Sequence, residues 1–598
     1  MKKVYHYYEN RIENASRRLI SLQKKIHSLG TIRLLLVIGA LITAWFVREQ
    51  DWKLIAGVLL LYAVPFVVLM VYHNLLSQKK SYEEALIDLC SNELKGLNYD
   101  FSAFDGAPEK AEGEHAFCLD LDIFGERSFF QSLNRTVTHM GREQLADWFI
   151  NPLTDKEAIL QRQEAVKELA PLIRLRQDFY VNGVLCPGNP DDVRLLANLS
   201  SPSGYFVNRL FWRASVWFVP LLWLIVAVGV ISGYLSLTVC NLLFILSFLT
   251  AYIRLRQINE LHKTVNKLEK ILLRYSELIK IIEKETFTSG LLSGLSRQLA
   301  CSQGTASRAI RKLSSHIGIL DQRATFTAIL LNIFTFRDIR ASIAIERWKE
   351  EHGAKTGDWF EALSCFDALS SLAGFAFNHP GYTYPAFVGS YFEISGKSLG
   401  HPLIPRDVCV KNDISIGQSP CFLIITGANM AGKSTYLRTV GINFVLAMTG
   451  APVCAGELRV YPARLVTSLR TSDSLISNES YFFAELKRLK MIIDRLHKGE
   501  KLFIILDEIL KGTNSTDKQK GSFALMKQLL AYKTHGIIAT HDLALGSLER
   551  DFPTQIKNYR FEADITGDTL TFSYQLREGI AQNMNATFLM QQMGITIA

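Results

Sequence analysis

The sequence predicts two kinds of architecture in one chain: a mostly parallel α/β domain at the C-terminal end, and before it an all-helical region with two apolar helical hairpins. Three observations predict this fold class. From residue 421 onward, short apolar β-rich runs alternate with helical stretches, an order that is typical of a parallel sheet. Residues 214–253 contain no charged side chain. Between these regions, apolar residues recur at spacings of three and four, the period of amphipathic helices.

The composition limits the classes of protein that need to be considered. At 598 residues the chain is long enough for several domains. It is 48% hydrophobic with a mean hydropathy of +0.12, although 21% of its residues are charged, so the apolar residues are expected to gather in segments. The nine cysteines are scattered without a C-x-x-C pair, which argues against a disulfide framework or a zinc site and favours reduced thiols in a cytosol. The net charge of +9 permits contact with nucleic acid or anionic lipid without demanding either.

The first apolar hairpin lies near the N-terminus. Residues 1–30 are predicted to form a basic helix that lies on an anionic membrane face or in solvent. Residues 34–47 and 54–72 then form two apolar arms around the loop REQDWK. The first arm is short, so Arg33 and Arg48 would have to extend along it to reach the membrane surfaces. Whether this arm crosses a membrane stays open at this point.

The second hairpin is the charge-free run itself. A membrane-spanning helix needs roughly 20 apolar residues, and residues 214–253 supply two such lengths, joined at SGYLS, residues 232–236. The alternative is a pair of buried core helices, which rarely run this long without a charge. Aromatic residues near the ends of the two hairpins suit the belts found at membrane interfaces: Trp45, Trp52, Trp212, Trp217 and Tyr252.

Basic residues at the flanks of the apolar runs predict the orientation. They precede the first run, follow the second and bracket the other hairpin, as at Arg33, Lys79, Arg209 and Arg254. Positive flanks remain on the cytoplasmic side. We therefore expect a multi-pass membrane protein with four spans, in which the N-terminus, the helical core and the α/β domain are all cytoplasmic.

These features divide the chain into five expected units. Residues 1–112 hold the basic helix and first hairpin, and the boundary is placed there because residues 99–115 are rich in Gly, Pro and charge. The other units are a first part of the helical core (113–205), the second hairpin (206–256), further long helices (257–390) and the α/β domain (391–598). The further helices begin with an apolar stripe that packing against a neighbouring helix would explain: Ile258, Leu261, Val265, Leu268, Leu272, Tyr275, Leu278 and Ile282.

A phosphate-binding loop is predicted between an apolar strand and a helix. GANMAGKS, residues 427–434, satisfies the pattern G-x-x-x-x-G-K-[ST] directly after the run FLIIT. Glycines let successive backbone N–H groups point at phosphate oxygens at a helix N-terminus, where the dipole favours anions. Lys433 would neutralise the β- and γ-phosphates, and Ser434 would ligate Mg²⁺. A chance match is the alternative, and the strand and helix around the loop argue against it. The expected nucleotide contacts are Gly427, Ala428, Asn429, Met430, Ala431, Gly432, Lys433, Ser434 and Thr435.

Two further strand ends carry polar groups. LFIILDE places Asp507 and Glu508 at the end of an apolar run, where Asp507 can hold the Mg²⁺ shell and Glu508 can orient or deprotonate a water. IIATHD places His541 where it can sense the γ-phosphate. Taken singly these could be a solvated acidic pair and an ordinary histidine. In this order after a phosphate loop they predict an ABC-like P-loop ATPase that uses ATP and Mg²⁺.

These motifs resemble the MutS mismatch-repair ATPases. TGANMAGKSTYLRTVG (426–441), LDEILKGTNSTD (506–517) and ATHDLAL (539–545) are similar to that family's phosphate loop, acidic strand and histidine switch. SYFFAEL (480–486) is similar to the segment whose serine, here Ser480, reaches the nucleotide of the partner subunit. The resemblance therefore implies a dimer with two composite ATP sites. It extends to the helical core and lever helices through residues 132–155 and 366–387, and covers most of residues 116–598 apart from the second hairpin.

The departures from the family matter as well. Asn478 and Glu479 stand where the family usually has Gly and Arg, and Ala428 and Ala431 replace a Pro and a Gly. Mismatch readers carry an N-terminal domain with a Phe-x-Glu motif, and here the first hairpin takes that place. The matching triplet at residues 124–126 is interpreted as chance. Residues 257–365 leave little room for the family's DNA clamp.

The sequence thus predicts a membrane-anchored ATPase that works as a homodimer and binds DNA in a repair or recombination role, without reading mismatches directly. The alternative is an ATP-driven conformational motor or scaffold at the membrane with no DNA ligand. Membrane lipid is a partner in both hypotheses, and DNA in the first only. The preserved ATPase and core favour the first hypothesis, while the missing reader domain and clamp favour the second.

Overall fold

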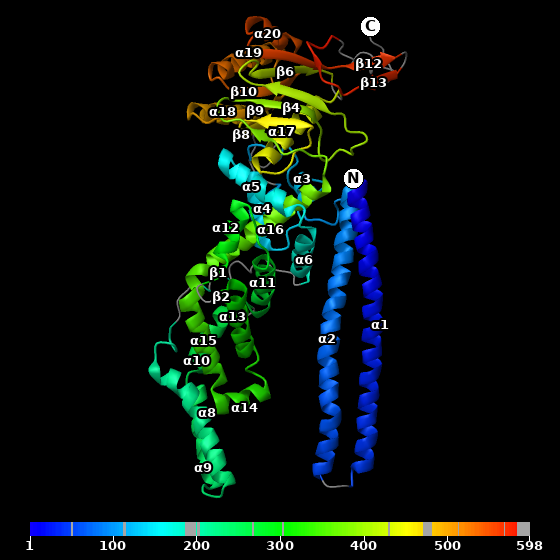
Figure 1. The fold of residues 1–598 in the computed structure, drawn as a ribbon. Coiled ribbons are helices and arrows are strands. Elements are labelled where there is room, and N and C mark those ends of the chain that lie inside the picture. The colour runs from blue at the N-terminus through cyan, green and yellow to red at the C-terminus, as the bar shows by residue number, and fades with distance from the viewer. Residues whose placement is uncertain are drawn as a thin grey trace.

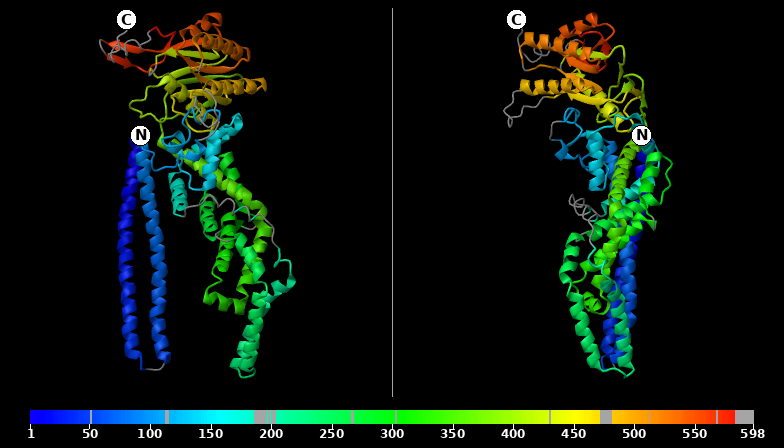
Figure 2. Two further views of the ribbon diagram at one scale, coloured as in Figure 1. Left: turned by 180° about the vertical axis from the view of Figure 1, so that it is seen from behind. Right: turned by 90° about the vertical axis from the view of Figure 1, so that its left-hand side faces the viewer.

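The computed structural model describes residues 1–49, 52–111, 115–185, 196, 199, 204–265, 268–301, 304–428, 431–470, 481–511, 513–566 and 569–582. The molecule is elongated, with the α/β domain at one end and two helical legs that extend side by side from the other (Figures 1 and 2). One leg is the N-terminal hairpin. The other is the far end of a helical lever that begins beneath the α/β domain. The α/β domain and the helical region predicted from the sequence are therefore both present.

The first leg consists of two antiparallel helices, α1 (Lys2–Val47) and α2 (Trp52–Leu97). Each has 46 residues, or about 69 Å at 1.5 Å per residue. The basic N-terminal segment and the first apolar arm thus belong to one continuous helix. Within the apolar part the helices lie close together, since a Cβ added to Gly39 would approach Tyr62 Cε1 to 3.2 Å. The Thr43 and Tyr62 hydroxyls share a hydrogen bond of 3.0 Å there.

The first leg contacts the rest of the molecule at its upper end. Tyr8 donates a 2.9 Å hydrogen bond to Asn378 Oδ1 at the end of α16 (Thr356–Asn378). Asn378 in turn donates to Glu93 Oε2 of α2 at 2.8 Å, and Arg135 pairs with the same carboxylate at 2.7 Å. These buried groups lie beside a small apolar cluster formed by α1, α2 and α6 (Ile173–Val184). The first leg is therefore attached near the junction of the helical core and the α/β domain.

The helical core lies directly below the α/β domain. It contains η1 (Pro108–Lys110), α3 (Phe129–Leu133), α4 (His139–Ile150), α5 (Lys156–Leu169), α6 and α12 (Gly290–Gln298), packed around α16. Asp367 of α16 is buried and accepts from the backbone N–H groups of Val137 and Thr138 and from the Thr138 hydroxyl. Burial raises the pKa of Asp367 to about 6, against the effect of these donors. This carboxylate joins the lever to the start of α4.

The lever below the core is formed by α10 (Leu255–Val265), α11 (Leu268–Glu283), α13 (Ala306–Asp321), α15 (Arg337–His352), η3 (Gly353–Lys355) and α16. A short hairpin, β1 (Ala300–Cys301) and β2 (Gly304–Thr305), precedes α13. All eight residues of the apolar stripe between Ile258 and Ile282 are buried, which confirms that prediction. The stripe extends over two helices, α10 and α11, and α11 packs closely on α13.

The second leg extends from the lower end of the lever. It contains α8 (Leu210–Ile231) and α9 (Leu237–Tyr252), joined by residues 232–236, and the short helix α14 (Phe326–Thr335) packs on both. The helical hairpin and its turn lie where the sequence predicts them. The interpretation of Trp212 as a belt residue is wrong, because its side chain is 5% exposed and belongs to the main core, whereas Trp217 is 76% exposed. Trp212 lies in the first turn of α8, which is still covered by the lever.

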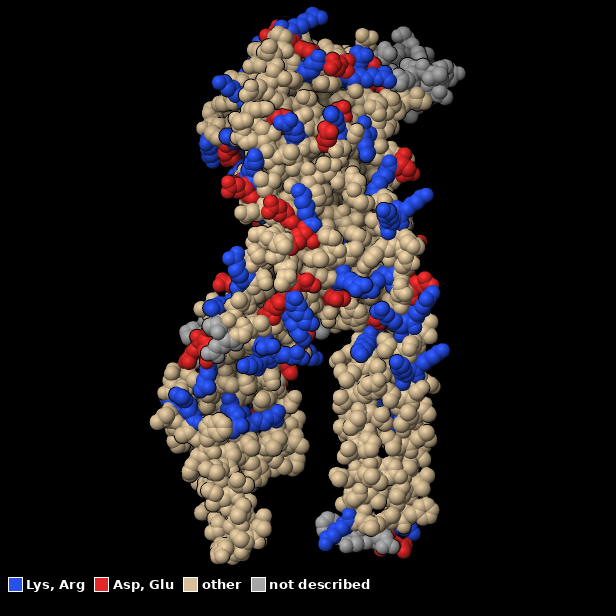
Figure 3. Space-filling model, viewed as in Figure 1, with Lys and Arg blue, Asp and Glu red and all other residues tan. Residues whose placement is uncertain are grey.

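Four helices in the described part of the chain are long and apolar enough to cross a membrane, by length and composition alone. Three of them are α1, α2 and α8. The fourth, residues 337–378 of α15 and α16, is mostly buried inside the molecule. Two bent helix pairs, α9 with α10 and α13 with α14, would raise the number to six. On the face shown in Figure 3, the lower parts of both legs form bands without charged residues at the same level, and charges return only at the tip of the first leg.

The α/β domain contains a six-stranded sheet with the order β14-β11-β6-β10-β9-β8. The five strands from β11 to β8 are parallel and only β14 is antiparallel, as the alternating pattern predicts. Helix α17 (Lys433–Met448) covers one face, and α18 (Tyr481–His497), α19 (Ser515–Ala531) and α20 (Leu548–Asp551) cover the other. The strands are β6 (Phe422–Gly427), β8 (Arg464–Ser468), β9 (Leu502–Asp507), β10 (His535–Thr540), β11 (Ile556–Phe561) and β14 (Arg577–Glu578).

A second sheet of four strands, β3-β7-β4-β5, lies on the other side of α17. Its strands are β3 (Ala386–Phe387), β4 (Ile394–Leu399), β5 (Asn412–Ile416) and β7 (Glu457–Val460). The remaining elements are η4 (Leu543–Ser547) and the ribbon of β12 (Ala563–Thr566) and β13 (Thr569–Phe572). One apolar core runs without interruption from the α17 face of the large sheet through the helical core to the lower lever. The α/β domain and the lever are therefore packed as one body.

Candidate phosphate-binding site

The site lies at the carboxyl ends of β6, β9 and β10, where parallel sheets usually bind ligands. The register brings these ends together, since Thr540 of β10 pairs with Thr426 of β6, and Ala539 pairs with Asp507 of β9. Gly427, Glu508 and His541 come next along the chain. Three motifs that are far apart in sequence thus meet at one edge of the sheet.

The loop between β6 and α17 depends on its two glycines. Gly427 has φ of 150°, and a Cβ there would lie 2.4 Å from the Phe561 carbonyl oxygen. Gly432 has φ of 105° and precedes the first residue of α17, so the free N–H groups of that helix face the loop. Ala428 and Ala431 are described with them, whereas Asn429 and Met430 lie outside the described residues.

Lys433 lies inside the loop. Its side chain is buried, and Nζ donates to the carbonyl oxygens of Gly427 at 2.7 Å and Ala428 at 3.0 Å. It also lies 3.3 Å from His541 Nε2. Burial lowers the pKa of Lys433, while the neighbouring Asp507 and Glu508 oppose that shift. The ammonium group is thus held by carbonyl oxygens that an anion in the loop can replace.

Ser434 and Asp507 form an oxygen-donor pair beside the loop. The Ser434 hydroxyl donates a 2.6 Å hydrogen bond to Asp507 Oδ2, while the buried Oδ1 has no hydrogen-bond partner among the described residues. Burial raises the pKa of Asp507 and the Ser434 hydrogen bond opposes the increase. A hydroxyl and a carboxylate with a spare oxygen are the donor types that Mg²⁺ prefers, so these residues fit that ion. Thr435 lines the same cavity.

Glu508 and His541 form the third part of the site. Glu508 has a left-handed backbone, with φ of 49°, and its N–H donates to the Ala539 carbonyl. Its Oε1 lies 2.7 Å from His541 Nε2, and Lys511 Nζ lies 3.3 Å from Oε2. The hydrogen bond with His541 is the largest cause of the low pKa of Glu508, about 2. The carboxylate is thus ionised and held by two neighbours.

Glu485 is a supporting residue that the sequence reasoning missed. It lies on α18, is 3% exposed, and accepts hydrogen bonds from the backbone N–H groups of Leu510 and Lys511. Leu510 also has a left-handed backbone, with φ of 59°. Glu485 therefore fixes the turn that follows Glu508. A signal was present, because this glutamate is part of the SYFFAEL segment, but its role required knowledge of which loop it faces. Ser480, at the start of that segment, lies outside the described residues.

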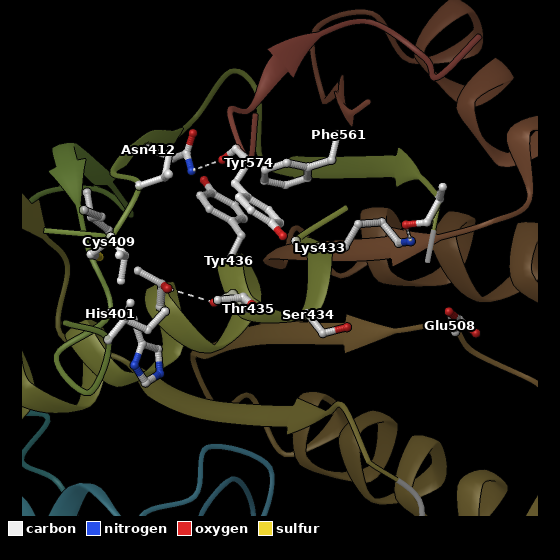
Figure 4. Close-up of a pocket in the computed structure, with 17 residues that line it drawn as sticks. His401, Cys409, Asn412, Lys433, Ser434, Thr435, Tyr436, Glu508, Phe561 and Tyr574 are labelled. Atoms are coloured by element: carbon white, nitrogen blue, oxygen red, sulfur yellow. Dashed lines mark hydrogen bonds between the residues drawn. The ribbon is translucent and has the colours of Figure 1, made fainter. Parts of the chain in front are cut away.

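A cavity of about 420 Å³ extends from the phosphate loop along the N-terminal end of α17. Figure 4 shows Lys433, Ser434 and Glu508 at one end, His401 and Asn412 at the other, and Tyr574 between them. Asn412 Nδ2 donates to the Tyr574 carbonyl at 3.0 Å, which closes the roof. The cavity thus has one cationic, hydroxyl-lined end and one largely apolar and aromatic end, as a nucleotide would require. Nothing in the sequence indicated the residues of the second end.

The segment 401–411 separates this cavity from another. A second cavity, of about 200 Å³, is lined by Met1 at the start of α1 and by Arg406 and Lys411. His401, Ile404 and Cys409 line both cavities. One wall of the candidate nucleotide site is therefore also a wall of the space beside the N-terminal end of the first leg.

The Phe124 triplet is placed away from this site. The Phe124 side chain is 7% exposed, and its ring packs against Phe130 at a centroid distance of 5.1 Å. The neighbouring Asp120 and Asp122 instead join the helical core to the α/β domain. Asp122 pairs with Arg438 of α17 at 3.2 Å. A buried Phe124 cannot insert beside a base, which agrees with the interpretation of the triplet as chance.

Comparisons with known proteins agree with this arrangement. The model of MutS domain III matches residues 118–376, which include the second leg, and the model of MutS domain V matches residues 423–594. The chain is 26% identical over 593 residues to the DNA mismatch repair protein MutS of Aquifex pyrophilus, covering 90% of this chain and 64% of that protein.

Two further relatives carry the same description, DNA mismatch repair protein MutS. The protein from Persephonella marina is 26% identical over 507 residues, which cover 79% of this chain and 57% of the relative. The protein from Thermotoga petrophila is 32% identical over 225 residues, 37% of this chain and 28% of the relative. The chain thus spans less than two thirds of the length of these relatives.

Proposed function

Because the chain belongs to the MutS family, we propose that it binds and hydrolyses ATP with Mg²⁺, and that it does so as a dimer anchored in a membrane. The observation that carries the ATPase proposal is the meeting of Lys433, the Ser434–Asp507 pair and the Glu508–His541 pair at one sheet edge. An anion site, a divalent-cation site and a water-orienting carboxylate together are the parts that phosphoryl transfer to water requires.

In this proposal the residues act in a defined order. Lys433 and the N–H groups of the loop hold the phosphates, and Ser434 and Asp507 hold Mg²⁺, which neutralises charge that develops on the phosphate oxygens. A carboxylate with a pKa of about 2 accepts protons poorly, and His541 is the main cause of that low pKa. When His541 turns toward a phosphate oxygen, the pKa of Glu508 rises toward its ordinary value, and Lys511 still opposes that rise. Glu508 is then able to orient and deprotonate the attacking water.

The membrane part of the proposal rests on the two legs. Their exposed side chains are large and apolar, as at Leu41 and Leu61 in the first leg and Leu224 and Leu242 in the second, all at least 62% exposed. Contiguous apolar surface of this extent is characteristic of a membrane or partner contact. Basic residues flank both bands on the side of the α/β domain, which supports a cytoplasmic position for that domain.

For the ligand we propose DNA, bound in a repair or recombination role. The family and the names of the relatives support this assignment. Direct mismatch reading is not proposed, since the Phe124 ring is buried. In a homodimer with composite sites, Ser480 of each copy would reach the nucleotide of the other, and Asn478 and Glu479 would alter that contact.

The test is ATP hydrolysis by the full-length protein in lipid nanodiscs, with and without homoduplex, mismatched and branched DNA, at two salt concentrations. Lys433→Ala serves as the inactive control. We expect turnover that DNA stimulates, with an affinity that falls steeply as salt rises. Turnover by the Lys433→Ala variant equal to that of the wild type would overturn the site assignment.

A second function is favoured by the shared wall at residues 401–411. In this case the ATPase changes the conformation of membrane helices, as a motor or scaffold, and binds no DNA. Residues 401–411 border the candidate nucleotide cavity on one side and the space beside Met1 on the other. A nucleotide that displaces His401 or Ile404 therefore also changes the surroundings of Met1, at the start of the first leg. Turnover that is indifferent to every DNA but dependent on the bilayer would select this function.

A further inference from the structure

Helix α14 is an apolar element that neither hairpin includes. It contains ten residues, FTAILLNIFT, without a charge, and follows α13 after a bend of 110°. At 1.5 Å per residue it is about 15 Å long, which is half the thickness of a bilayer core. It cannot span a membrane as a single helix. Figure 1 shows it lying across the lower end of the lever instead of continuing along it.

One side of α14 packs on the second leg. The Phe334 ring lies 4.7 Å from that of Trp223 on α8 and 6.4 Å from that of Phe244 on α9, between ring centroids. Ala328 and Ile333 are buried with it. Helices α8, α9 and α14 thus form one apolar unit.

Two other large side chains of α14 are left largely uncovered by the described part of the chain. The side chains of Phe326 and Leu331 are 75% and 49% exposed, and both are large and apolar. Helix α14 packs on both α8 and α9, whose other large apolar side chains are exposed, as at Leu224 and Leu242. Arg323 precedes the helix and Arg337 follows it, so charge returns at both ends. A short apolar helix with charged ends suits the boundary between lipid headgroups and acyl chains.

The height of α14 fits that boundary. In Figures 1 and 3 it lies where the charge-free band of the second leg begins, on the side toward the lever. Lys and Arg residues appear immediately above this level on the face shown in Figure 3. An element at the upper edge of the band would meet the headgroup region and not the centre of the bilayer.

Helix α14 is firmly joined to the lever. Phe336, between α14 and α15, has a left-handed backbone with φ of 48° and is buried. Across this corner, Asn332 donates to Asp338 Oδ2 at 3.1 Å and accepts from the Asp338 N–H at 3.0 Å. Helix α15 then leads through η3 into α16, which reaches the base of the α/β domain. A displacement of the lever therefore carries α14 with it.

We propose that α14 is an interfacial helix that embeds Phe326 and Leu331 in the bilayer at its cytoplasmic surface. This proposal rests on the membrane anchoring proposed above and adds a third membrane contact to the two hairpins. Through α14 the lower end of the lever contacts the membrane surface directly, in addition to its contact with the two helices that cross the membrane. The occupant is lipid, because α14 packs on the two helices that are proposed to cross the membrane and lies at the edge of their charge-free band.

The test places the photo-crosslinking residue p-benzoylphenylalanine singly at three exposed leucines of the full-length protein. These are Leu331 in α14, Leu221 in α8 and Leu273 in α11, with 49%, 54% and 42% exposure. All three are surface positions, so the substitutions should fold alike. The proteins are assembled in nanodiscs of phosphatidylethanolamine and phosphatidylglycerol and irradiated, and lipid adducts are measured by mass spectrometry.

We expect lipid adducts at Leu221 and Leu331 and none at Leu273. Adducts at Leu221 without adducts at Leu331 would overturn the interfacial helix while leaving the hairpin in the membrane. Absence of adducts from both would instead overturn the anchoring itself. Crosslinks from Leu331 to a second copy or to another protein, in place of lipid, would also overturn the proposal, because the face would then be a protein interface.

Discussion

The two legs of the molecule end in similar apolar helices but are attached in different ways. The first leg packs mainly on itself and meets the rest of the chain at its upper end, through Tyr8 and Glu93. The second leg extends from the lower end of the lever, and its residues Trp212, Val216 and Ala251 belong to the main core. The tip of the first leg is charged, as at Arg48 and Lys53, whereas residues 232–236 at the tip of the second are not.

This difference indicates that the two legs have different roles. In the described part of the chain, the first leg contributes no residue to the main apolar core, so its membrane part can be removed without opening that core. It therefore suits a membrane anchor whose upper end lies beside the wall shared with the nucleotide cavity. A hairpin that shares the core of the lever cannot move independently of it. The second leg, with α14, is therefore the leg that a movement of the lever would displace.

The largest effect is expected at the candidate nucleotide site. Glu508→Gln removes the carboxylate that orients and deprotonates water, and general-base loss costs about 100- to 10,000-fold in rate. ATP binding should persist, because Lys433, Ser434 and Asp507 are unchanged. Turnover and nucleotide binding are measured separately, and the exposed Lys557→Ala variant serves as a control. Full turnover in Glu508→Gln would remove this residue from the mechanism.

Deletions in each leg compare the two legs directly and should give the next largest effect on ATP hydrolysis. Replacing residues 214–253 with a short Gly-Ser linker should leave the protein membrane-bound through the first leg. In the second proposed function ATP hydrolysis depends on the bilayer, and that dependence should then fall several-fold, because the lever has lost the helices on which it acts. A protein in which residues 34–72 are replaced by a short linker, so that the contacts of Tyr8 and Glu93 remain, should retain that dependence. Should the chain without residues 214–253 stay both membrane-bound and fully dependent on the bilayer, the lever would not act on the second leg.

The joint between core and lever should show a smaller effect. Asp367→Asn retains the packing but places an amide where a buried carboxylate accepts from Val137 and Thr138. Leaving such donors poorly satisfied costs about 1–3 kcal/mol. Thermal unfolding in detergent should show this loss, and Thr138→Ser, which keeps the hydroxyl that donates to Asp367 and accepts from the Gly141 N–H, should show less. An unchanged melting temperature in Asp367→Asn would show that the joint does not stabilise the lever.

The smallest effect is expected where the upper end of the first leg contacts the end of α16. Tyr8→Phe removes the 2.9 Å hydrogen bond to Asn378, which contributes about 1 kcal/mol. Hydrogen exchange in the first turns of α1 should become faster by roughly fivefold, the equivalent of that free energy, while exchange in α8 and α9 stays the same. Tyr5→Phe, which loses only an exposed hydrogen bond to Asn98, is the matched control. Equal acceleration in both legs would contradict their separate attachment.

The features predicted correctly are those that local pattern encodes. The strand-end motifs require particular residue types at fixed spacing, and the fold brings Gly427, Lys433, Asp507 and His541 to one sheet edge as that spacing predicts, while their roles toward a nucleotide stay predictions. The second hairpin followed from the absence of charge over residues 214–253. The buried stripe from Ile258 to Ile282 followed from its spacing.

The features that were missed depend on tertiary contacts. Helix α14 is too short for a criterion based on the length of a span, and only the 110° bend shows how it lies. Glu485 and Tyr574 are remote from the loop in sequence, so their roles depend on which segments the fold brings together. Trp212 has the sequence position of an interfacial residue, but the lever covers it.

In the second proposed function, binding of a nucleotide in the cavity changes the conformation of the two legs. The most direct measurement is hydrogen–deuterium exchange of the full-length protein in nanodiscs, with and without Mg²⁺ and a non-hydrolysable ATP analogue. We expect the rate of hydrogen exchange to differ between the two conditions in residues 401–411, in the first turns of α1 and at the corner between α14 and α15. Changes confined to the phosphate loop and the end of β9, with both legs unaffected, would contradict it.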